Sequence, residues 1–180
     1  NVTGVQTCAL PICVLNTSDN VFISGEKLNL ISSLHSFVKN MEYVKYDLPK
    51  IFSDIDLNDD KNPMFNSNNI NIDSLINDLV NTTIKNIIAP YENKTIIGWK
   101  ENFISPVELG NDKALELLQF ACKIFPNLKF IINIRDAQKT SESTVWKLKN
   151  NSFEEIRQCR EWLINIHNSE ILGKNKKIGR

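Results

Sequence analysis

The chain has 180 residues, of which 42% are apolar, and this is enough for one domain with a hydrophobic core. Its 21 lysines and arginines balance 21 aspartates and glutamates, which disfavours a dedicated binder of nucleic acid or of an anionic membrane. The longest apolar runs fall far short of the roughly 18 residues that a membrane span needs, so no span is expected.

In the first part of the chain, a short apolar run precedes two segments whose apolar residues recur at helical spacing. Residues 21–24 predict a strand that ends at Gly25, and apolar side chains then recur at helical spacing over residues 28–41. Residues 54–71 are polar and rich in asparagine, so we expect a surface excursion there. Residues 72–88 carry a long helical stripe that stops before Pro90.

The second part reads as strand, helix, strand. Residues 94–99 and 128–134 predict strands, and residues 115–124 predict the helix between them. Apolar strands joined by a crossover helix are typical of a buried parallel sheet, so the predicted fold class is α/β. Two more helices are expected, around residues 140–149 and over residues 153–166.

Polar residues follow each predicted strand, where ligands bind in open α/β sheets. Glu26 follows the first strand, Lys100 the second and Arg135 the third, and Ser143 stands eight residues beyond Arg135. A guanidinium and a hydroxyl so placed can grip one phosphate. The alternative is that Arg135 pairs with Asp136 and that Ser143 is an ordinary helix-surface residue.

Three segments carry a resemblance to a known family. FPNLKFIINIRDAQKTSEST, at residues 125–144, resembles the 3′-phosphate-binding segment of sulfotransferases, with its proline-started strand, arginine and later serine. Gly-Trp-Lys-Glu at residues 98–101 is similar to that family's Gly-x-Lys-Glu strand end. Leu15-Asn16 with VFISGEKLNL at residues 21–30 resembles the stretch after its phosphosulfate loop. These landmarks stand in the family's order between residues 13 and about 146.

The resemblance implies a three-layer αβα domain of the nucleoside-phosphate-binding, P-loop NTPase-like type. It implies that Arg135 and Ser143 bind the 3′-phosphate of the sulfuryl donor, 3′-phosphoadenosine 5′-phosphosulfate (PAPS). Glu26 matches the position of a general base, and Lys100 matches a lysine that neutralises charge on the sulfuryl group. The acceptor would be a hydroxyl or an amine, with carbohydrate as our expectation, and no metal is needed.

In-line sulfuryl transfer explains these residue types, because it needs a base for the acceptor and fixed positive groups where charge develops. Partial burial could raise the pKa of Glu26 and make it a base. Each residue also has a simpler interpretation. Glu26 could be an acid favoured at a helix N-terminus, and Lys100 a solvated lysine paired with Glu101.

The chain departs from the family at its beginning, where a loop rich in Gly, Ser and Thr should bind the phosphosulfate. Residues 2–12, VTGVQTCALPI, instead resemble a translated sequencing adapter. We therefore expect residues 1–12 to be foreign, residues 13–172 to be a partial domain, and residues 173–180 to be a polar tail. Such a fragment should be inactive. Lys27 and Ser24 also replace an asparagine and an arginine that relatives often carry.

Two other functions stay open at this point. A P-loop kinase would share the sheet but needs a Walker lysine and magnesium. A non-catalytic nucleotide-binding or scaffold domain could keep the motif residues for its fold alone.

The four cysteines form no CxxC pair or Cys/His cluster, so we expect reduced thiols in a cytoplasmic protein with no metal. His35 and His167 are expected to be surface or boundary residues.

Overall fold

The computed structural model describes residues 12–168, with gaps at residues 13, 28, 53, 55, 63, 89–93, 101–105, 132–135 and 143–152. It combines helices with a two-stranded parallel sheet, in agreement with the predicted α/β class. The elements in chain order are β1 (Val21–Glu26), α2 (Leu30–Glu42), η1 (Tyr43–Asp47), α3 (Leu48–Ile51), η2 (Ser67–Asn69), α4 (Ile72–Thr83), η3 (Ile84–Ile88), β2 (Ile96–Lys100), α5 (Pro106–Leu109), α6 (Asn111–Ile124), α7 (Ala137–Ser141) and α9 (Phe153–Asn168).

The two strands pair in parallel, which confirms that prediction, with Phe22 opposite Ile97 and Ile23 opposite Gly98. Successive side chains of a strand point to opposite faces of the sheet. Phe22, Ile97 and Trp99 therefore share one face, and all three pack against the main hydrophobic core. On the other face, a Cβ at residue 98 would lie 3.0 Å from Ile23 Cδ1, so glycine lets the Ile23 side chain approach β2.

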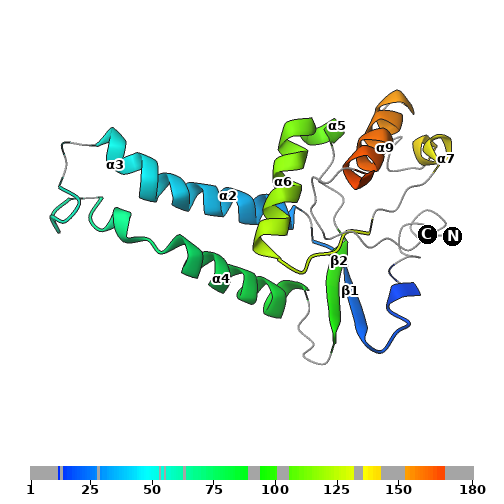
Figure 1. The fold of residues 1–180 in the computed structure, drawn as a ribbon, viewed down its shortest axis with the longest axis horizontal. Helices are drawn as coiled ribbons and strands as arrows, with labels where there is room; N and C mark the ends of the chain where they lie inside the picture. The colour runs from blue at the N-terminus through cyan, green and yellow to red at the C-terminus, as the bar shows by residue number, and fades with distance from the viewer. Residues whose placement is uncertain are drawn as a thin grey trace.

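Helices α2, α4 and α6 supply most of the core over this face. The helical stripes predicted for residues 28–41 and 72–88 form α2 and α4, and the latter continues into the π-helical turn η3. Figure 1 shows α2 and α4 side by side in a long hairpin that extends away from the sheet, with α6 near its sheet end. The buried core residues are Leu30, Ile31, Leu34, Val38, Ile88, Leu117, Phe120, Ala121, Ile124 and Phe125.

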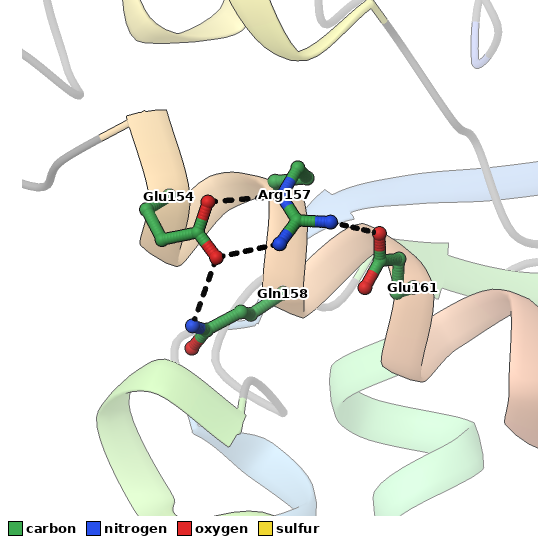
Figure 2. A network of polar contacts seen from close by, with 4 residues as sticks. All are labelled: Glu154, Arg157, Gln158 and Glu161. Carbon is green, nitrogen blue, oxygen red and sulfur yellow. Dashed lines mark hydrogen bonds and ion pairs between the residues drawn. The ribbon is translucent and has the colours of Figure 1, made fainter.

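Helix α9 forms where residues 153–166 predicted a helix. Its apolar side packs on α6, where Trp162 and Ile166 meet Leu118 in a second, smaller cluster. Its exposed side carries the polar network of Figure 2, in which Arg157 donates to Glu154 from Nε (2.9 Å) and Nη2 (2.7 Å) and to Glu161 from Nη1 (2.5 Å). These partners stand three or four residues apart, so the network supports one helix and is not a site.

The third predicted strand differs from expectation in its described part. Residues 128–131 form no strand ladder, although Leu128 and Phe130 pack into the core while Lys129 and Ile131 are exposed. The prediction rests on a run of apolar residues, but a strand also needs a hydrogen-bonding neighbour, which the sequence pattern does not report. The remainder of that run, residues 132–134, lies outside the described residues.

The helix expected around residues 140–149 falls mostly outside the described residues, and the described residues before it form the short helix α7. Helix α7 starts at Ala137 because Asp136 caps it, accepting the Lys139 backbone N–H at 2.9 Å. Residues 143–149 lie outside the described part of the chain. The surface excursion predicted for residues 54–71 is confirmed, since its only regular element in the described residues is the short 3₁₀ turn η2.

Candidate functional site

The carboxyl ends of the two strands bring two of the predicted site residues together. Glu26 and Lys100 are Cα partners at the last pair of the β1–β2 ladder. The register shifts between Ser24 and Glu26, which leaves Gly25 as the extra residue of a bulge. Bulges bend a strand and change the direction in which the following side chains project. The strand ends therefore place an acidic and a basic residue at one edge of the sheet.

The surroundings of this pair differ between the two strands. Lys100 is partly buried and takes part in an interaction, so the strand-end lysine is not simply solvated. Ser24, one residue before the bulge, is buried, with 8% of its surface exposed. The structure describes the backbone of Glu26 but not its side chain. Its predicted role as a base thus stays a prediction.

Trp99 links two of the segments that carry the resemblance. Its ring packs on Phe125, with centroids 5.5 Å apart and planes inclined by 57°. Phe125 begins the segment that leads to Arg135, and Trp99 immediately precedes Lys100. The Trp99 indole N–H is buried and has no hydrogen-bond partner among the described residues. An aromatic contact therefore joins the end of β2 to the start of the segment that carries the family resemblance.

The third landmark, Leu15-Asn16, is attached to β1. The Asn16 side chain accepts from the Ile23 N–H at 2.7 Å and donates to the Ile23 carbonyl at 2.9 Å. A carboxamide carries one acceptor and two donor hydrogens, so it can bind the edge of a strand as a neighbouring backbone would. Sequence patterns gave no signal for this role, because the two residues belong to different elements.

The other two predicted site residues, Arg135 and Ser143, lie outside the described residues. The described flanks are Ile131 on one side and Asp136 on the other. Asp136 has a defined structural role as the N-cap of α7. The phosphate clamp predicted from Arg135 and Ser143 therefore stays a prediction.

His35 is a residue whose importance the sequence interpretation missed. It was expected at the surface or a boundary, but it is buried between α2 and α6 with 3% of its surface exposed. The signal was its spacing, because it stands four residues after Ile31 and three before Val38 on the same apolar stripe. The side chain of His167, at the end of α9, lies outside the described residues.

Comparison of the chain with models of known protein families, with curated proteins and with solved structures gives no match. Among the described residues, no cluster of three or more His, Cys, Asp and Glu side chains could hold a metal ion. No described helix is both long and apolar enough to cross a membrane.

Proposed function

We propose that this chain is part of a sulfotransferase that moves a sulfuryl group from PAPS to a hydroxyl or amine, with carbohydrate as the expected acceptor. The proposal includes a three-layer αβα fold of the P-loop NTPase-like type around the β1–β2 sheet. One observation supports it above the others. Glu26 and Lys100, far apart in sequence, are paired at the carboxyl ends of parallel strands, where open α/β sheets bind their ligands.

The proposed reaction assigns a step to each of these residues. The acceptor O–H or N–H gives its proton to the Glu26 carboxylate as the acceptor atom forms a bond to sulfur. The bond between sulfur and the bridging phosphate oxygen breaks, and 3′-phosphoadenosine 5′-phosphate leaves. Lys100 offsets the negative charge that develops on the transferred group, as positioned cations do in such transition states. No metal takes part in this scheme.

Arg135 and Ser143 complete the proposed site by holding the 3′-phosphate. Two contacts lend support to this arrangement, because both tie segments of the resemblance to the sheet. Phe125, at the start of the phosphate-binding segment, packs on Trp99 beside Lys100, and Asn16 binds the β1 backbone at Ile23. The order of landmarks in the sequence and their contacts in the fold are thus consistent with one site.

Nucleotide binding tests the proposal most directly. The full 180-residue chain should bind 3′,5′-ADP more tightly than 5′-AMP in isothermal titration calorimetry, because only the former carries the 3′-phosphate. Arg135→Ala should weaken 3′,5′-ADP binding by roughly 10- to 100-fold, since a hydrogen bond to a charged group is worth about 1.5–3 kcal/mol. Ser143→Ala should weaken it less.

Arg157→Ala is the matched control, because this arginine binds Glu154 and Glu161 on the exposed side of α9. Its affinity for 3′,5′-ADP should equal that of the unmodified chain. Equal affinities of Arg135→Ala and Arg157→Ala, or of 3′,5′-ADP and 5′-AMP, would contradict the phosphate clamp. Preferential binding of ATP with magnesium would favour a kinase instead.

A further inference from the structure

The side chain of His35 forms a closed set of polar contacts between α2 and α6. Its Nε2 lies 3.0 Å from Glu116 Oε1, and its Nδ1 lies 3.4 Å from Lys113 Nζ. Lys113 Nζ is also 2.9 Å from Glu116 Oε2, so the three groups contact one another. Phe120 packs edge-on against the imidazole with centroids 4.9 Å apart. Both ring nitrogens of a buried histidine are therefore engaged by residues of the neighbouring helix.

These contacts favour one protonation state of the ring. A lysine ammonium has only donor hydrogens, so a hydrogen bond between Lys113 Nζ and His35 Nδ1 makes the ring nitrogen the acceptor. The hydrogen of a neutral imidazole then resides on Nε2 and is donated to the Glu116 carboxylate. A second proton on Nδ1 would point an N–H at the Lys113 ammonium. The contacts fit the neutral Nε2–H tautomer and disfavour the charged ring.

The charges around the ring act in the same direction. Burial lowers the pKa of His35 below its ordinary value of 6.5, and the positive charge of Lys113 lowers it further. Glu116 acts in the opposite direction but does not reverse the shift, and Lys39 on α2 adds to the lowering. Lys39 is itself paired with Glu42 at 3.3 Å. The charges that shift the pKa of His35 thus lie on both α2 and α6.

We propose that His35 is a pH-sensitive latch, which joins α2 to α6 when it is neutral and loosens their contact when it is protonated. A cavity of about 210 Å³ lies beside the ring, lined in part by Lys39, Gln119 and Lys123, and it gives water a route to the interface. Helix α2 starts four residues after Glu26, so loosening would reach the carboxyl end of β1. The latch is independent of the proposed sulfuryl transfer.

The sign of the effect follows from the lowered pKa. The unfolded chain takes up a proton at His35 near pH 6.5, whereas the folded chain resists it until a lower pH. The stabilising contribution is therefore complete above about pH 6.5 and is lost as the pH falls through the folded-state pKa. Acidification should weaken the α2–α6 interface over that window.

The chain suits a direct test, because it contains only two histidines. In a full chain with His167→Gln, the remaining imidazole signals in ¹⁵N NMR belong to His35. We expect the Nε2–H neutral tautomer at pH 7.5 and titration below pH 6.5. Amide-exchange protection factors, corrected for intrinsic rates, should fall in α2 and α6 as the ring becomes charged. An Nδ1–H tautomer or a charged ring at pH 7.5 would refute the proposal. It would also be refuted if amide protection in α2 and α6 did not change as His35 titrates.

Two variants separate the latch from ordinary packing. Lys113→Met removes the ammonium that faces Nδ1, so the His35 titration should move to higher pH. The Lys113 side chain is 44% exposed, so an apolar chain of similar length should fit there. His35→Gln keeps a donor and an acceptor without a titratable ring, so protection in α2 and α6 should no longer follow the pH between 7.5 and 5. An unmoved titration in the first variant, or a persistent pH response in the second, would refute the proposal.

Discussion

Two neighbouring isoleucines at the end of η3 offer a matched test of the core. Ile88 is buried, with 2% of its surface exposed, and belongs to the cluster formed by α2, α6 and the sheet. Ile87, the preceding residue of the same π-helical turn, is 43% exposed. Replacing each by alanine makes the same chemical change in the same local backbone, so the difference between the variants reports burial.

The magnitude follows from the exposed fractions. Isoleucine to alanine removes three carbon groups, worth about 0.8 kcal/mol each when fully buried, or about 2.4 kcal/mol. At Ile88 nearly all of this is lost and an unfilled cavity adds to it, so Ile88→Ala should cost about 3 kcal/mol, within the usual range of about 2–5. At Ile87, which is 43% exposed, little more than half of the transfer free energy applies and no cavity forms, so Ile87→Ala should cost about 1.4 kcal/mol.

Urea unfolding followed by circular dichroism measures this difference of about 1.6 kcal/mol. With an m-value of about 2 kcal/mol/M, the midpoint of Ile88→Ala should lie about 0.8 M below that of Ile87→Ala. Equal midpoints would refute the placement of Ile88 in the core, as would the opposite order. If the m-value is unchanged in both variants, the difference between their midpoints reports a difference in stability.

Two further outcomes test other parts of the fold. Asn16→Ala removes both hydrogen bonds to Ile23 and should lower the free energy of unfolding by about 1–2 kcal/mol; a change below about 0.3 kcal/mol in urea unfolding would argue against that contact. Burial raises the pKa of the Cys122 thiol, so iodoacetamide should alkylate it several-fold more slowly in the native chain than in urea at pH 8. Peptide mass spectrometry gives both rates, and equal rates would place Cys122 at the surface.

The elements that rest on local periodicity were predictable from the sequence. The stripes that became α2, α4 and α9 place apolar side chains every three or four residues, and burial of such a stripe is what stabilises a helix in a domain. The strands β1 and β2 likewise follow from short apolar runs, and their parallel pairing follows from the helices between them. The short helix α7, which Asp136 caps at its start, was not predicted, because the apolar spacing gave no signal for a helix there.

The candidate site could be predicted only in part. Strand ends point to Glu26 and Lys100 because polar residues follow apolar runs, but their direct pairing depends on a bulge at Gly25. No sequence period reports a bulge, since it shifts the register of one strand against another. The Trp99–Phe125 contact and the binding of Ile23 by Asn16 are equally invisible, because each joins separate elements.

The sequence by itself determined where α2, α4, α6, α9, β1 and β2 form, because the spacing of neighbouring residues decides which side chains can be buried together. It did not determine whether the apolar run at residues 128–131 finds a strand to pair with. Only the tertiary structure decided what each buried face meets. His35 stands on a predictable stripe, yet Lys113, its partner, is 78 residues away and on another helix. Burial and the charge of that distant side chain, both set by packing, lower the pKa of the imidazole.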